Sequence, residues 1–281
     1  MNFIRYESAE AFGADTLEIL SEHEMQNNLL ISFILGGGDK KDWFFAAVKD
    51  GAGSVLLSAA WTGLPFNIVL YETNNKPNDA ALTLMAAELK GLALPFPGVL
   101  AEQGLARRFA QIYAERQNVT LSMNIMRLDK VIPVEKSPGF ARPLTESDLF
   151  FVPYWERIFC EDCHVEVFDI PTNTEQLRQR LADSKQHHLI WEDGFPVSQA
   201  AHTRSTQNGA VVNWVYTPPH YRGKGYASSV VAELSCRILE EYKFCGLFAD
   251  AANPISCGIY RKLGYYDLCV YDSVTFEGEK T

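Results

Sequence analysis

Residues 215–228 read VYTPPHYRGKGYAS, and this stretch decides how the rest of the chain is interpreted. An apolar run ends at Tyr216, two prolines follow, and Gly223 and Gly225 stand just before a helical pattern. That pattern is carried by Ala227, Val230, Val231, Leu234 and Ile238. The stretch therefore predicts a loop that connects a strand, Ala210 to Tyr216, to the N-terminus of a helix.

Such a loop is suited to binding a phosphate group. The first backbone N–H groups of a helix have no partner within the helix, and the helix dipole makes this end positive. Glycine lets the backbone approach an anion closely, and Arg222 and Lys224 add positive charge. A tight turn that needs glycine for its torsions explains the same residues equally well. The loop alone does not decide between the two interpretations.

Two common phosphate loops fit poorly. A nucleotide-triphosphate loop needs Ser or Thr after its lysine, whereas Gly225 follows Lys224. The dinucleotide pattern is only half present, because Ser228 stands where the third glycine is required. Three successive strands are predicted before the helix, over 186–192, 197–204 and 210–216. This order favours an antiparallel meander over alternating strands and helices.

Three motifs in order resemble the GNAT superfamily of N-acetyltransferases. Arg222-x-x-Gly225-x-Ala227 is similar to the family's acetyl-CoA loop, Arg/Gln-x-x-Gly-x-Gly/Ala. NPISCGIYRKLGY at 253–265 resembles its second signature, and RPLTESD at 142–148 resembles the start of many family domains. The resemblance spans about residues 140–275. It implies that an amine attacks acetyl-CoA, the co-substrate, directly in a ternary complex.

The resemblance also implies roles for individual residues. The matching Asn253 would contact the pantetheine arm, and the matching Tyr260 would protonate the leaving thiolate, which a phenol can do. Seven helical positions separate the two, so they share one face, although helix capping and core packing explain them as well. The strand's backbone, one N–H near Val215 included, and the loop amides would hold the co-substrate. The predicted binding residues are Val215, Tyr216, Thr217, Arg222, Gly223, Lys224, Gly225, Tyr226, Ala227, Ser228, Asn253 and Tyr260.

The general base is not fixed by the sequence. Many family members place a carboxylate on the fourth strand, where this chain has Asn213 and Trp214. Asp250, at the end of the next predicted strand, is the first candidate, and turn formation is its competing interpretation. Glu166, His202 and a water relay are the other possibilities.

The N-terminal half repeats the same order of elements. Trp43 and His188 are 145 residues apart, and so are Val99 and Phe244. The sequence thus predicts a mixed, mainly antiparallel α/β fold of two tandem GNAT-like domains, 1–132 and 142–281, joined by a linker at 133–141. The loop equivalent to 222–228 reads ETNNKPN at 72–78. It lacks glycine and its proline removes an amide donor, which predicts that this half has lost CoA binding.

The amino-acid composition limits the kinds of partner that the protein can bind. The 281 residues include 35 acidic and 25 basic side chains, a net charge of −10 that argues against nucleic-acid binding. No apolar run is long enough to span a membrane, and the first residues do not resemble a secretory signal. We expect a cytoplasmic protein, monomer or homodimer, that acts on a small-molecule or peptide amine.

The sequence also contains a cysteine-histidine motif and leaves two other functions open. CEDCH at 160–164 fits a haem-attachment pattern, but one Cys pair and one His fall short of a zinc site, so no metal is expected. A non-catalytic CoA-binding sensor or interaction module is the competing function, since the fourth strand offers no evident base. A nicotinamide enzyme is a weaker alternative.

Overall fold

The computed structural model describes residues 1–36, 41–163, 165–183 and 187–277, which form two compact units. One unit contains Met1–Ile125 with Leu268–Thr281, and the other contains Met126–Asp267. Each half of the chain has the same order of elements, apart from short 3-10 turns: strand, two helices, three strands, helix, strand, helix, strand. The repeat confirms the predicted mixed fold in tandem. The boundaries predicted for the two domains stay a prediction.

The first half supplies these elements: β1 (Asn2–Tyr6), α1 (Ala9–Glu22), α2 (Asn28–Leu35), β2 (Phe44–Lys49), β3 (Val55–Trp61), β4 (Ile68–Glu72), α3 (Asp79–Leu92), β5 (Gly98–Glu102), α4 (Gln103–Tyr113) and β6 (Gln117–Leu128). The second half supplies these: β7 (Phe140–Pro143), α5 (Val152–Asp162), α6 (Ile170–Ala182), β8 (His188–Glu192), β9 (Pro196–Ser205), β10 (Gly209–Tyr216), α7 (Tyr226–Glu241), β11 (Phe244–Asp250), α8 (Pro254–Lys262) and β12 (Tyr266–Phe276). The predicted strands and helices are found at these places within a few residues, except that Gln186, the predicted start of β8, lies outside the described residues.

In the first unit the strands are ordered β1-β2-β3-β4-β5-β12. Neighbours are antiparallel except β4 and β5. Alternate residues of the strands are buried on opposite faces, as a two-residue period requires. On β2, for example, Phe44 and Ala46 belong to the core with α3 and α4, whereas Phe45 packs with α1 and α2.

The last strand extends beyond its predicted end at Tyr271. Residues 271–275 of β12 pair with β5 in the first unit. Within this extension Asp272 is fully buried and accepts hydrogen bonds from Arg107 Nε, Ser122 Oγ and Gln103 Nε2. Local sequence pattern does not predict this pairing, because the extension reads DSVTF and polar residues are not typical of a buried strand.

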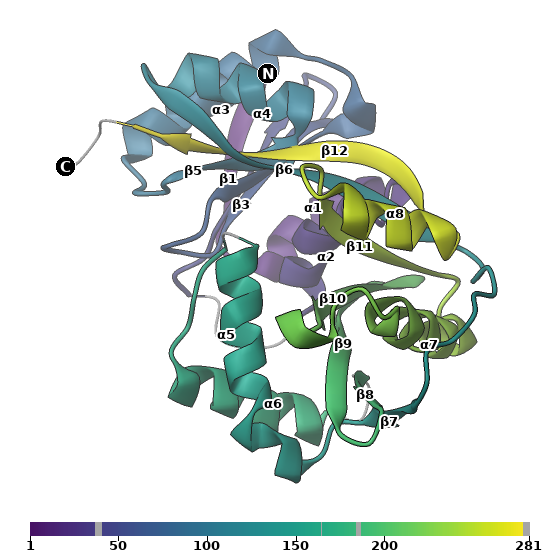
Figure 1. Cartoon of the computed structure of the whole chain (residues 1–281). Helices are drawn as coiled ribbons and strands as arrows, with labels where there is room; N and C mark the ends of the chain where they lie inside the picture. Colours follow the sequence, from purple (N-terminus) through teal and green to yellow (C-terminus); the bar gives the residue numbers. More distant parts are fainter. Residues whose placement is uncertain (37–40, 164, 184–186, 278–281) are drawn as a thin grey trace. The chain divides into compact units, whose positions relative to one another are not determined.

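In the second unit the strands are ordered β11-β10-β9-β8-β7, and only β10 and β11 are parallel. Helices α5 and α6 lie on one side of β8–β10, and α7 lies on the other (Figure 1). Ile190 packs in the core of the α5 and α6 side, whereas its neighbours Leu189 and Trp191 pack with α7. A layered unit of this kind places β10 between two sets of helices.

Asp272 should be a main source of stability in the first unit. Replacing Asp272 by Ala removes three hydrogen bonds from a buried site, so we expect the free energy of unfolding to fall by about 2 kcal/mol or more. Chemical denaturation measures this change. Asp267→Ala is the control, because the Asp267 carboxylate is 43% exposed and pairs with Arg261; its effect should stay below about 1 kcal/mol. Equal effects would contradict this account of Asp272.

Candidate active site

The parallel strands β10 and β11 part before either of them ends. Their ladder holds three pairs, from Gly209–Phe244 to Val211–Gly246, although the strands continue to Tyr216 and Asp250. On its other edge β10 bulges against β9 between Asn213 and Tyr216. Trp214 and Val215 therefore have no partner residue in either described ladder.

Trp214 adopts the left-handed backbone conformation at the bulge. Its φ is +54°, and its N–H donates to the Asn213 side-chain oxygen at 2.8 Å. This conformation costs about 1–2 kcal/mol for a residue with a Cβ, so surrounding contacts must hold it. The Phe159 ring, 5.3 Å from the Trp214 ring, supplies one such contact. The bulge therefore fixes the backbone at Val215, in a part of β10 that pairs with neither neighbouring strand in the described ladders.

The loop after β10 leaves the first turn of α7 accessible. Gly223 and Gly225 have φ values of +78° and +80°, and Gly225 caps the helix without a side-chain hydrogen bond. The Tyr226 side chain turns into the core, where its hydroxyl lies 2.5 Å from Asp193, so Tyr226 offers the loop only its main chain. Ala227 and Ser228 follow in the same turn. Among the described residues no atom lies within 4 Å of a Cβ built at Gly223, so the loop has an open side.

The Arg222 side chain lies over the loop and pairs with the end of α5. Its Nη2 lies 2.8 Å from Asp162, and its Nε donates to the Thr217 carbonyl at 2.9 Å. Arg222 and Asp162 are both about half exposed. A pair this exposed to solvent contributes little, so an anion can replace Asp162 at small cost. Lys224 extends over the Tyr221 ring.

Helix α8 supplies the other two predicted side chains. Asn253 caps it, with Oδ1 accepting the Ser256 N–H at 3.1 Å. Tyr260 is buried and belongs to the same core cluster as Tyr226. Val215 packs against this cluster. Burial, and then the Cys163 and Cys257 thiols, raise the pKa of the Tyr260 hydroxyl. The phenol therefore stays protonated at neutral pH, as a proton donor must.

The three candidate bases lie in different surroundings. Asp250 ends β11, and its Oδ1 accepts the Ala252 N–H at 2.8 Å, so it forms the turn. Glu166 is exposed and outside any helix or strand. His202 is buried beside Tyr242, directly after α7, and burial followed by the influence of His187 lowers its pKa to about 4. Since α7 has 16 residues and is about 24 Å long, His202 lies at the opposite end of that helix from the loop.

Helices α5 and α6 bring an ion pair to the bulge that the sequence analysis did not identify. Glu156 is fully buried, and Arg180 Nη2 lies 2.7 Å from its carboxylate. The Arg180 guanidinium is 5.2 Å from the centre of the Trp214 ring. Burial raises the pKa of the Glu156 carboxyl, and the Arg180 cation offsets only part of this rise. The sequence signal was a carboxylate on the buried stripe Val152, Glu156, Cys160.

Several buried polar atoms near this pair have no hydrogen bond. They include Glu156 Oε1, Arg180 Nη1, His188 Nδ1 and Gln199 Nε2, none of which finds a hydrogen-bond partner in the described part of the chain. The His188 and Gln199 side chains meet each other at 3.3 Å. An unsatisfied buried group costs about 1–3 kcal/mol, so such a group usually marks water or a ligand.

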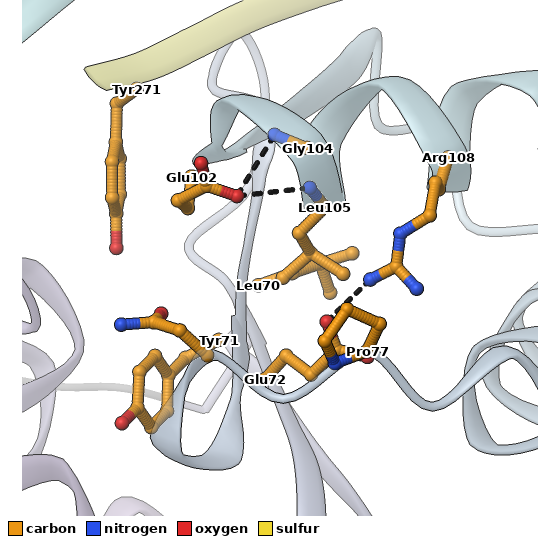
Figure 2. Close-up of a pocket in the computed structure, with 10 residues that line it drawn as sticks. Leu70, Tyr71, Glu72, Pro77, Glu102, Gly104, Leu105, Arg108 and Tyr271 are labelled. Carbon is orange, nitrogen blue, oxygen red and sulfur yellow. Dashed lines mark hydrogen bonds and ion pairs between the residues drawn. The ribbon is translucent and has the colours of Figure 1, made fainter. Parts of the chain in front are cut away.

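The first unit fills the equivalent place with its own carboxylates. Strands β4 and β5 also part, after two pairs, and a pocket of about 60 Å³ lies beside them (Figure 2). Glu72 accepts the Asn78 N–H before α3 and pairs with Arg108. Glu102 accepts the N–H groups of Gly104 and Leu105 at the start of α4. Anionic side chains thus occupy both helix N-termini.

The motif at 160–164 is only partly described, because His164 lies outside the described residues. Cys160 and Cys163 are free, and burial raises their pKa values, to about 12 and about 11. Over the described ranges no three His, Cys, Asp or Glu side chains are grouped to hold a metal ion.

Comparisons with known proteins support the resemblance found in the sequence. The model of the family described as FR47-like protein matches residues 193–272, from the turn before β9 into β12. A GCN5-related N-acetyltransferase from Sphaerobacter thermophilus superposes with a TM-score of 0.67 at 14% identity, covering 97% of this chain and 94% of that one. An acetyltransferase of the GNAT family from Colwellia psychrerythraea gives 0.60 at 10% identity, over 98% and 99%.

A tandem GNAT protein from the clavulanic acid biosynthesis pathway gives a TM-score of 0.58 at 14% identity, over 100% of this chain and 99% of that one. No curated protein matches the chain. The predicted resemblance to the GNAT superfamily, and its tandem fold, are confirmed. Separately, none of the helices in the described residues has the length and apolar character needed to cross a membrane.

The buried His188 should make the protein sensitive to acid. Burial, and then the Arg180 cation, lower the pKa of His188 to about 3, whereas an unfolded histidine titrates near 6.5. Between these values the unfolded chain binds the extra proton, so stability falls as the pH falls, by about 1.4 kcal/mol per pH unit from this group. We expect His188→Gln to flatten the decline between pH 6 and pH 4 in denaturant titrations. Exposed His220→Gln is the control, and an unchanged slope in His188→Gln would contradict the burial of a neutral ring.

Proposed function

We propose that the chain is an N-acetyltransferase with one acetyl-CoA site, in the Met126–Asp267 unit. The observation that carries the proposal is the parting of β10 and β11 before a glycine loop and a helix N-terminus that no side chain caps. The acceptor is a primary amine of a small molecule or peptide. Bound acetyl-CoA supplies the activated acetyl thioester. Residues of this chain bind the co-substrate, orient the reactants and protonate the departing thiolate.

The backbone provides the binding groups. In this proposal the loop amides from Gly223 to Ser228 and the Arg222 guanidinium bind the diphosphate, while the Arg222 N–H donates to the Pro219 carbonyl. The open side of Gly223 gives the anion room to approach the main chain. The unpaired edge of β10 offers its backbone to the pantetheine arm. We assign the Val215 N–H, which lies outside both described ladders, as the donor to the oxygen that becomes negative when the amine attacks.

Two side chains handle protons in this proposal. Tyr260 keeps its proton at neutral pH and donates it to the departing thiolate. Asp250 has one carboxylate oxygen committed to its turn and takes the amine proton through the other, directly or through water. Asn253 caps α8 and so fixes the helix that carries Tyr260.

Tyr260→Phe tests the proton donor. The substitution removes only the hydroxyl, so we expect kcat to fall about 100-fold while the dissociation constant of acetyl-CoA stays the same. Thiol release measures turnover, and calorimetry measures binding. Tyr266→Phe is the matched control, since Tyr266 follows α8 and is 44% exposed. Unchanged turnover in Tyr260→Phe would remove Tyr260 as the acid.

Substitutions in the loop test the binding site. Gly225→Asp places a negative charge and a strained residue at the helix N-terminus, and Arg222→Ala removes a cation. We expect each to weaken acetyl-CoA binding by about tenfold or more. Lys76→Ala, in the equivalent loop of the first unit, should change nothing, and calorimetry should find one acetyl-CoA per chain. Two molecules per chain, or normal affinity in Gly225→Asp, would refute the assignment.

A further inference from the structure

The second unit contains a cavity of about 170 Å³ that the proposed chemistry does not use. It lies where α6 ends and β8 begins, next to the end of β7. Leu144 and His188 are buried in its wall, and Pro143 is exposed at its rim. The charged side chains in the wall are those of Arg180, Arg237 and Asp183.

We propose that this cavity binds a carboxylate of the acceptor, so that the acceptor is an amine that also carries a carboxylate. The inference rests on the proposed function and adds the substrate class. It depends on three features: an unsatisfied buried guanidinium in the wall, a second unsatisfied group beside it, and contact between that guanidinium and the β10 bulge.

Arg180 is the main anchor for an anion. Its Nη2 is committed to Glu156, and the Trp214 ring lies over its guanidinium. Nη1 has no hydrogen bond in the described chain, although the side chain is only 11% exposed. A guanidinium nitrogen with its N–H groups unsatisfied is the donor that a carboxylate oxygen fits, because the charge-assisted bond replaces lost hydration.

His188 provides a second polar group in the cavity wall. Its Nδ1 is buried without a partner, and its Nε2 faces the Gln199 amide. A neutral ring that carries its proton on Nδ1, with the amide turned to donate to Nε2, has a buried N–H without an acceptor in the described chain, and this residue lines the cavity. Arg180 and His188 can then hold the two oxygens of one carboxylate.

The charged groups around the cavity are already paired, and Arg180 Nη1 is the guanidinium nitrogen among them that is buried without a hydrogen bond in the described chain. Glu156 is already paired with Arg180. Arg237 pairs with Glu233 at 3.4 Å, and His187 lies 2.9 Å from Glu241. Glu156 Oε1 also lacks a hydrogen bond, but Glu156 is not among the described residues that line the cavity. The acidic residue that does line it, Asp183, already takes part in an interaction, so a carboxylate is a better occupant than an amine.

Arg180 also connects the cavity with the reaction site. The same guanidinium that lines the cavity contacts Trp214, the residue before Val215. His188 pairs with Ala201, and Ala201 pairs with Asn213, so the cavity lies two strands from the bulge, or roughly 10 Å. An acceptor that spans this distance has several bonds between its amine and its carboxylate, as in an ω-amino acid.

Paired acceptors test the proposal in the full-length protein. Acetyl transfer is measured to γ-aminobutyrate and butylamine, and to ε-aminocaproate and hexylamine. We expect KM to be about tenfold lower for an amino acid than for its parent amine. Arg180→Gln should abolish the difference, and Arg178→Gln should keep it, since Arg178 lies on the same helix and is 54% exposed. Equal KM values within both pairs in the wild-type protein would overturn the proposal.

Two further measurements keep the test independent of folding and of turnover. Arg180→Gln leaves Glu156 buried without its cation, so the neutral pair Glu156→Gln with Arg180→Gln is made as well. Binding of butyrate is then followed by NMR titration without acetyl-CoA. Butyrate binding that needs Arg180 supports the cavity site even if no amine is acetylated. The absence of acetylation would then refute only the transferase proposal. Absence of butyrate binding, or equal binding by the double variant, refutes the carboxylate site.

Discussion

The separation of two parallel strands is the constraint on which the candidate site depends. In a parallel pair each strand satisfies its neighbour's backbone, so strands that part leave amides and carbonyls open. β10 and β11 part after three pairs, and the bulge at Trp214 frees the other edge of β10 at the same level. The exposed backbone at Val215, the glycine loop and α8 are useful only because this opening exists.

Both units contain such an opening, and they differ in what satisfies the helix ends beside it. β4 and β5 part after two pairs, yet Glu72 and Glu102 accept the N–H groups at the starts of α3 and α4. A diphosphate there would meet two carboxylates instead of free amides. At α7 the cap is Gly225, which has no side chain to accept those N–H groups. The two units therefore differ in whether side-chain carboxylates occupy the helix N-termini beside the opening.

The sequence predicted those parts of the structure that local patterns determine. Glycines at 223 and 225, the apolar stripe of α7 and the Asn253-Pro254 start of α8 are local signals, and the structure places each as expected. Local patterns do not show which distant residue a buried side chain contacts. Asp272 reads as a surface residue until β12 pairs with β5. Glu156 stands on a buried helix stripe, but its partner Arg180 lies 24 positions later and only the fold brings the two together.

The buried pair of Glu156 and Arg180 is hard to explain by stability. Removing two charges from water costs several kcal/mol per ion, and apolar side chains of similar volume often serve a core as well or better. This pair leaves a guanidinium nitrogen unsatisfied, which adds to the cost. What the pair provides is position: it fixes a cation against the Trp214 ring, whose backbone is held in an unfavourable conformation next to the proposed oxyanion donor. A costly arrangement at this place is best understood as part of a site, because strain and unsatisfied charge concentrate where a protein binds or reacts.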